Sequence, residues 1–273
     1  HNRRTFVKHT GGVAVAAAAV PYFFSSKKTL ADESKSKNDR LRIGLIGSGG
    51  MGVGNLRVAK EWGDTVAIAD VDTNKSGWGN QELTGGKADV YQDYRKVLER
   101  DDLDAIHIAT PDHWHAKPLI EAVRAGHDVY CEKPLTLNIE EGQWVRQAVE
   151  ETGRVVQVGT QQRSTFNLFT KDIAIVAAGR LGKINRGQEA IGGAYESPSI
   201  PVAAVPDHLD WDRWIGPAKM VDYRFDKVML TNKNPKEGES PEYQVTYTNG
   251  HFEFRWWYDF SGGKLTDWGA HHV

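Results

Sequence analysis

The sequence predicts an α/β protein that combines a doubly wound parallel sheet with a second, α+β domain. A buried strand at residues 41–46 runs directly into a glycine-rich turn and a helix. Strands and helices then alternate up to about residue 160, and this order implies parallel strands joined by right-handed crossovers. The pattern changes after Ser164. We therefore expect a first domain at 41–160 and a second at 161–273.

Residues 1–40 are predicted to be an export signal followed by a linker. Arg3 and Arg4 precede Phe6 and Lys8, and an apolar run follows at residues 11–24. This run is too short for a comfortable membrane span. A basic region, an apolar region and then a polar stretch is the order of a signal peptide, and paired arginines are typical of the twin-arginine route. A disordered basic tail beside a short apolar helix is the alternative.

The turn after the first strand has the spacing G-x-G-x-x-G at Gly47, Gly49 and Gly52. Gly47 allows a sharp turn, Gly49 allows close approach of a pyrophosphate, and Gly52 allows helix and strand to pack closely. The helix that begins near Gly50 and Met51 offers free N–H groups and a partial positive charge to phosphates. The turn is therefore predicted to hold a dinucleotide in a Rossmann-type domain.

A second apolar strand, at residues 65–70, ends in Asp70, 18 residues after Gly52 (70 − 52). A carboxylate at this distance is expected to bind the adenosine ribose hydroxyls. No arginine directly follows Asp70, so we expect NAD, with NADP as the alternative. A strand-end aspartate in an ordinary turn is the competing interpretation, and Asp72 and Asn74 nearby are typical of such turns.

The alternation continues through four further strands and three further helices. The expected strands cover residues 88–91, 104–109, 128–131 and 154–158, and the expected helices cover 94–100, 113–125 and 140–152. Parallel strands bring their carboxyl ends to one edge, where ligands collect. Three of these ends carry polar residues: 110–115, 132–134 and 159–163. A lysine partly desolvated at that edge, such as Lys133, would suit proton transfer or alkoxide stabilisation.

At these residues the chain resembles the Gfo/Idh/MocA family of sugar and polyol oxidoreductases. The matching motifs are the glycine turn, Ala109-Thr110-Pro111 with His115, Glu132-Lys133-Pro134, and Asp267-x-x-x-His271. The leader is similar to that of exported members of the glucose–fructose oxidoreductase type. The resemblance implies hydride transfer between a nicotinamide cofactor and a hydroxyl or carbonyl group of a sugar or polyol.

The resemblance also implies roles for individual residues. Lys133, Asp267 and His271 would be catalytic, with His271 as general base. Asp267 would orient His271 or hydrogen-bond a substrate hydroxyl, and Lys133 would stabilise an alkoxide or relay its proton. Pro134 is expected to follow a cis peptide bond. The cofactor, acquired before export of the folded protein, is expected to be tightly bound. We expect its contacts to come from Gly47, Gly49, Gly50, Met51, Gly52, Asp70, Thr110, Pro111, His115, Glu132, Lys133 and Gln161.

In the second domain we expect a helix at 166–178, a strand at 184–192 and an exposed loop at 232–242. The family implies a large, mostly antiparallel sheet here, incomplete because the sequence stops at Val273, and assembly into dimers or tetramers. The segment 211–217 is interpreted either as a packed aromatic turn or as part of a substrate cleft. Asp267 and His271, four residues apart, would share one helical face, although Asp267 could instead cap that helix.

Composition excludes several other classes of protein. The formal net charge is −2 and no basic stripe is interleaved with aromatics, so nucleic acid is not an expected partner. Stable membrane insertion is not expected either. The single cysteine, Cys131, excludes an internal disulfide framework and is interpreted as a small buried hydrophobe. Several histidines, among them His113 and His272, raise the question of zinc, but we expect no metal site.

Two alternatives to a dehydrogenase remain. The first is an NAD-dependent glycosidase that oxidises C3 transiently; relatives of that kind typically lack the lysine of the Glu-Lys-Pro motif. The second is a binding or regulatory protein on a dinucleotide-binding scaffold. This second alternative predicts that Lys133, Asp267 and His271 do not face one common cavity.

Overall fold

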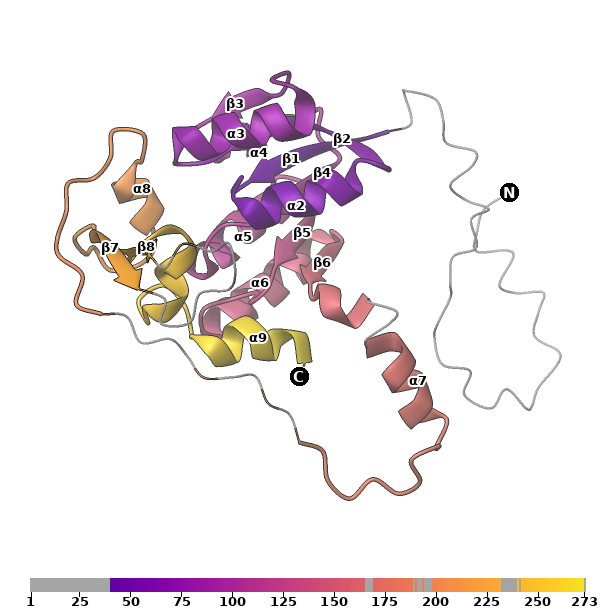
Figure 1. The fold of residues 1–273 in the computed structure, drawn as a ribbon. Coiled ribbons are helices and arrows are strands. Elements are labelled where there is room, and N and C mark those ends of the chain that lie inside the picture. Colours follow the sequence, from indigo (N-terminus) through magenta and orange to yellow (C-terminus); the bar gives the residue numbers. More distant parts are fainter. Residues whose placement is uncertain are drawn as a thin grey trace. The chain divides into compact units, whose positions relative to one another are not determined.

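In the computed structural model, six parallel strands form one sheet in the order β3-β2-β1-β4-β5-β6 (Figure 1). The strands are β1 (Leu41–Ile46), β2 (Gly63–Ala69), β3 (Asp89–Tyr91), β4 (Ala105–Ile108), β5 (Asp128–Glu132) and β6 (Val156–Gly159). The order reverses direction between β1 and β4, so the crevice expected to bind ligands lies at the carboxyl ends of these two strands. The structure describes residues 40–164, 169–188, 190, 193, 198–231, 240 and 242–272. Apart from Arg40, the predicted leader and linker lie outside this part of the chain.

Helices cover both faces of the sheet and divide its core in two. Val53 and Leu56 of α2 (Gly50–Ala59) and Leu83 of α3 (Thr73–Thr84) pack with β1 residues on one side. A larger cluster packs α5 and α6 on the other side. The remaining helical elements of this part are α4 (Arg95–Leu98), η2 (Asp112–Trp114), α5 (Ala116–Arg124), α6 (Ile139–Thr152) and η3 (Gln161–Ser164). The predicted α/β class is confirmed.

The six strands expected within residues 41–160, and all but one of the α-helices there, occur where the apolar pattern placed them, within a few residues. Helix α3 was not predicted. Its segment carries two glycines, which disfavour a helix interior. Packing explains Gly79, because a Cβ there would lie 2.9 Å from Cβ of Ser48 in the glycine turn. Asp72 begins the helix by accepting hydrogen bonds from the N–H groups of Asn74 and Lys75.

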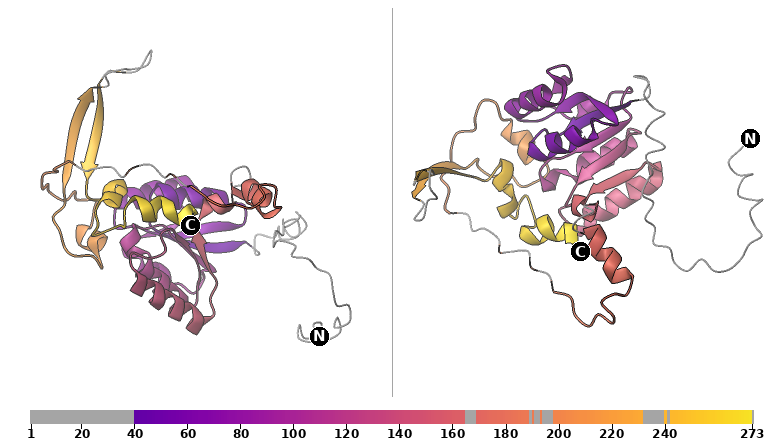
Figure 2. Two further views of the ribbon diagram at one scale, coloured as in Figure 1. Left: turned by 90° about the horizontal axis from the view of Figure 1, so that it is seen from below. Right: turned by 45° about the vertical axis from the view of Figure 1, so that its right-hand side comes forward.

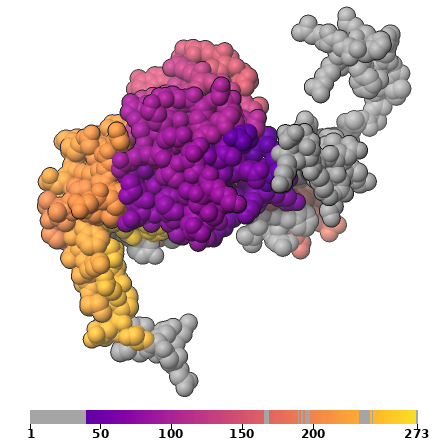
Figure 3. Space-filling model, turned by 90° about the horizontal axis from the view of Figure 1, so that it is seen from above, coloured from indigo at the N-terminus to yellow at the C-terminus, as the bar shows by residue number. Residues whose placement is uncertain are grey.

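The C-terminal part adds helices and a two-stranded sheet. Its elements are α7 (Lys171–Ala177), α8 (Trp211–Ile215), β7 (Phe225–Thr231), β8 (Glu242–Thr248), η5 (His251–Trp256) and α9 (Lys264–His272). Strands β7 and β8 pair antiparallel and project from the rest of this unit (Figures 2 and 3). Residues 184–188 of the expected strand at 184–192 are not in a strand, and most of the expected loop at 232–242 lies outside the described residues.

An aromatic cluster forms the core of the C-terminal part. Trp211 and Trp214 stack at 4.7 Å between ring centroids, and Phe260 meets Trp214 edge-on at 4.9 Å. All three residues are buried. The segment 211–217 therefore packs in an aromatic core, as one of the two interpretations predicted, and its residues 211–215 form α8. None of the helices in the described part of the chain is long and apolar enough to cross a membrane.

The close contact between α2 and β1 can be tested with two alanine substitutions in one helix. A Cβ on residue 52 would lie 2.2 Å from the carbonyl oxygen of Gly47, whereas a Cβ on the exposed Gly54 would meet nothing within 4 Å. We expect Gly52→Ala to lower the free energy of unfolding by about 1–3 kcal/mol through overpacking. Gly54→Ala should raise it by up to about 1 kcal/mol through helix propensity. Urea denaturation measures both, and equal effects would contradict this account.

Candidate active site

The glycine turn opens onto a cavity of about 950 Å³. Gly47 has a φ of 88°, a conformation that favours glycine, and a Cβ there would lie 2.7 Å from backbone atoms of Ala109. Gly49 and Gly50 have open space where a Cβ would stand, and both line the cavity together with Met51. The N-terminus of α2 therefore presents bare backbone to the cavity, which fits the phosphates of a dinucleotide.

Asp70 lines the same cavity and also stabilises the turn. One carboxylate oxygen accepts the N–H of Ser48 at 2.8 Å, and the other accepts the N–H of Asp72 at 3.0 Å. Burial raises the pKa of Asp70, while these backbone hydrogen bonds act in the opposite direction. Asp70 therefore stabilises the turn, as the competing interpretation expected, and it also lines the cavity in which the ribose would bind. Its role toward ribose stays a prediction.

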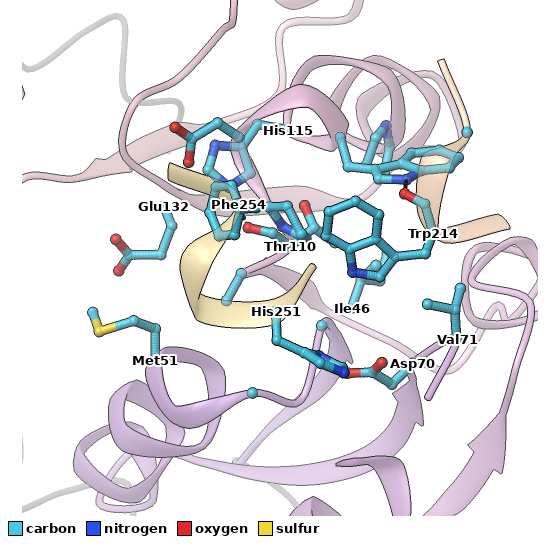
Figure 4. Close-up of a pocket in the computed structure, with 18 of the residues that line it drawn as sticks. Ile46, Met51, Asp70, Val71, Thr110, His115, Glu132, Trp214, His251 and Phe254 are labelled. Atoms are coloured by element: carbon cyan, nitrogen blue, oxygen red, sulfur yellow. Dashed lines mark hydrogen bonds between the residues drawn. The ribbon is translucent and has the colours of Figure 1, made fainter. Parts of the chain in front are cut away.

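His115 joins the ends of two strands. Its Nδ1 lies 2.5 Å from the carbonyl oxygen of Pro134, and its Nε2 lies 2.8 Å from that of Thr110. The ring is 1% exposed, yet the residue lines the cavity beside Thr110 and Pro111 (Figure 4). His115 therefore fixes the spacing between the loops that follow β4 and β5.

Glu132 is buried beneath Lys133. Asn55 donates from Nδ2 to its Oε1 at 2.6 Å, and Gln161 donates to the same oxygen. Burial raises the pKa of Glu132, and the hydrogen bond from Asn55 opposes this. Gln161, expected to contact the cofactor, thus holds Glu132, and the neighbouring Gln162 lines the cavity. The Lys133–Pro134 peptide bond is cis, as expected.

The three predicted catalytic residues line this one cavity. Lys133, at the end of β5, donates from Nζ to Oδ1 of Asp267 at 2.5 Å and to its carbonyl oxygen at 2.7 Å. Asp267 and His271 lie one turn apart on α9, and both are 8% exposed. The alternative of a binding or regulatory protein predicted that these three side chains would not face one common cavity. Asp267 does not cap α9, since that helix begins at Lys264 and the carboxylate is engaged by Lys133.

Arg255 is a second cation on Asp267 that the sequence did not reveal. Its Nε lies 3.4 Å from Asp267 Oδ1, and its guanidinium lies over the rings of Phe252 and Phe254. Burial disfavours the ionised form of Asp267, but Lys133 and Arg255 outweigh it and hold its pKa below the ordinary value. No spacing pattern marks Arg255, which sits in a dense aromatic segment on η5.

His113 contacts the backbone of α8. Its Nε2 lies 3.0 Å from the carbonyl oxygen of Trp214, and burial lowers its pKa to about 4. Among the residues that the structure describes, no three His, Cys, Asp or Glu side chains are placed to share a metal ion. Cys131 is buried in the core of the sheet, where burial raises the pKa of its thiol.

Several of the known proteins to which this chain is similar are named as inositol dehydrogenases. The inositol 2-dehydrogenase of Rubrobacter xylanophilus is 35% identical over 216 residues, which are 75% of this chain and 59% of that protein. Inositol 2-dehydrogenase 4 of Saccharopolyspora erythraea is 35% identical over 192 residues, covering 65% of this chain and 54% of that protein. The crystal structure of myo-inositol 2-dehydrogenase from Lactobacillus plantarum covers 53% of this chain and 43% of its own, with 30% identity and a TM-score of 0.49.

The chain thus spans a little over half the length of these two curated relatives. A family model described as "Oxidoreductase family, NAD-binding Rossmann fold" matches residues 41–160. The match covers the six-stranded sheet, the glycine turn, Asp70 and Lys133. Residues 41–160 therefore belong to the GFO_IDH_MocA oxidoreductase family, as its NAD-binding Rossmann domain.

Proposed function

We propose that this protein is an NAD-dependent dehydrogenase that oxidises a secondary hydroxyl group of a sugar or cyclitol. One observation carries the proposal: Lys133, Asp267 and His271 line the cavity onto which the glycine turn opens. Inositol dehydrogenases among the relatives support the substrate class. Bound nicotinamide would accept or return the hydride. NAD is preferred to NADP because a carboxylate, Asp70, stands where the adenosine ribose is expected.

The residues of the chain would handle the proton. Lys133 uses two of its N–H donors on Asp267, which leaves a third for the substrate oxygen. A substrate hydroxyl placed there would lose its proton to His271, one helical turn from Asp267. The two cations, Lys133 and Arg255, would stabilise the negative charge that develops on that oxygen. Aromatic side chains around the cavity, Phe252, Phe254 and Trp268, offer apolar faces for the ring of the substrate.

Replacing Lys133 tests this mechanism. We expect Lys133→Ala to bind NADH within a few-fold of the unsubstituted protein but to lower turnover by roughly 10²–10⁴-fold. Fluorescence titration measures NADH binding, and a panel of inositols and sugars with NAD measures turnover. Lys96→Ala, at an exposed lysine paired with Glu99, is the matched control. Unchanged turnover in Lys133→Ala would sink the assignment, and release of sugar from glycosides without net NADH formation would favour the glycosidase alternative.

We also propose that the protein is exported by the twin-arginine route and works outside the cytoplasm, with its cofactor tightly bound. The order of charged and apolar residues in 1–28 supports this. Assembly into dimers or tetramers is a further part of the proposal. It rests on the family resemblance.

The export proposal can be tested with residues 1–40 fused to a folded fluorescent protein in a bacterium with this export route. We expect the fusion to reach the periplasm and the Arg3→Lys, Arg4→Lys double variant to remain inside, because the route reads the arginine pair. The Lys27→Arg, Lys28→Arg double variant is a charge-matched control. Cell fractionation measures the distribution, and export that is insensitive to the arginine pair would contradict the proposal.

A further inference from the structure

We propose that residues 208–216 form a strap that covers the adenosine half of the dinucleotide site and slows release of the cofactor. The strap is the segment from His208 to Gly216, which includes α8. It comes from the C-terminal part, outside the matched family region at 41–160. The proposal rests on the proposed function for the identity of the ligand alone.

One end of the strap is attached directly after Asp70. The N–H of Thr73 donates to the carbonyl oxygen of His208 at 2.9 Å, and the N–H of Asp210 donates to that of Val71 at 3.0 Å. Asp72 and Leu209 thereby form an antiparallel bridge. This end of the strap is therefore paired with residues 71–73, which directly follow Asp70.

Asp72 reinforces this attachment with its side chain. The residue is 3% exposed. Nδ1 of His208 lies 3.0 Å from Oδ1 of Asp72, and Nε2 of His251 lies 3.5 Å from Oδ2. His251 adopts a φ of 45°, which is uncommon outside glycine and is found at ligand clamps. A single buried carboxylate therefore begins α3 and contacts two histidines of the C-terminal part.

The other end is attached after β4. The carbonyl oxygen of Trp214 lies 2.8 Å from the donating Nε1 of Trp114 and 3.0 Å from Nε2 of His113. Gly216 has a φ of 50°, and a Cβ there would lie 1.9 Å from the ring of Trp114. Only glycine allows this approach, so the strap is seated closely on η2.

The path between the two ends crosses the cofactor crevice. In the sheet, β1 lies between β2 and β4, and the carboxyl end of β1 is the glycine turn. The strap is fixed after β2 and after β4, the two strands that flank β1, and it lines the cavity onto which that turn opens. Asp212, Trp214 and Gly216 accordingly line the same cavity as Asp70 and Tyr94 (Figure 4).

The charges of Asp93 and Arg213 agree with this placement of the strap. Hydrogen bonding from Arg95 lowers the pKa of Asp93 to about 2, and the charge of Arg213 in the strap acts in the same direction. Asp93 and Arg213 both line the cavity, so the loop before α4 and the strap each form part of its wall. A dinucleotide bound there would leave only after the strap detaches at one end, so that release is slower than from an open crevice.

The test measures cofactor release and does not depend on turnover. Trp114→Phe removes the indole N–H that holds Trp214 and keeps an aromatic ring, and His208→Ala removes the contact with Asp72. We expect NADH to dissociate about fivefold faster from each variant and more than tenfold faster from the double variant, as for lost hydrogen bonds. Stopped-flow fluorescence after mixing with excess NAD gives the rates. Trp62→Phe, at an exposed tryptophan next to the amino end of β2, is the matched control.

Hydrogen exchange on the unsubstituted protein provides a second measurement that needs no folded variant. Saturating NADH should slow exchange of the amides in 208–216, while those of the projecting strand β7 serve as an internal reference. Unchanged dissociation rates in the double variant, or unchanged exchange in the strap, would overturn the strap while leaving the dehydrogenase intact. Failure of the unsubstituted protein to bind NADH would instead overturn the proposed function.

Discussion

The approach of α2 to the end of β1 is the constraint on which the site depends. A Cβ on residue 52 would stand 2.2 Å from the carbonyl oxygen of Gly47, so the helix begins this close to the strand because residue 52 is glycine. The close start brings the N-terminus of α2 to the carboxyl edge of the sheet, beside the ends of β4 and β5. Every other element of the cavity is placed relative to that edge. His115 bridges the two neighbouring loops there.

Much of the nucleotide-binding half could be predicted because its determinants are local. Apolar runs mark β1 to β6, and glycines mark the turn that follows β1. The contact between Lys133 and Asp267 spans 134 positions and could be inferred only from the family resemblance. Helix α3 was missed because its two glycines, Gly77 and Gly79, disfavour a helix, and the reason for Gly79 is tertiary packing against Ser48.

Arg255 and the strap could not be predicted for a related reason. Each depends on contacts between residues far apart in the chain, such as Trp114 with Trp214 or Asp72 with His208. No period or spacing encodes such pairs. The segment 211–217 shows how one pattern can have two meanings at once: Trp214 packs on Trp211 in the aromatic core and also lines the cavity. Trp214 therefore belongs both to the aromatic core and to the wall of the cavity, which the sequence pattern presented as alternatives.

Charge around Lys133 favours a substrate that becomes negative. Lys133 and Arg255 share a single carboxylate, that of Asp267. Burial raises the pKa of both neighbouring carboxyls, Glu132 and Asp112, and so disfavours their ionised forms. Lys133 and Arg255 thus place two cations on one anion in a partly desolvated pocket, where Coulomb interactions are stronger than in water. In the proposed reaction, these two cations would stabilise the oxyanion that forms when a substrate hydroxyl group loses its proton. The contacts that would stabilise this oxyanion join Lys133, directly after β5, to η5 and α9, whereas the glycine turn would hold the proposed cofactor.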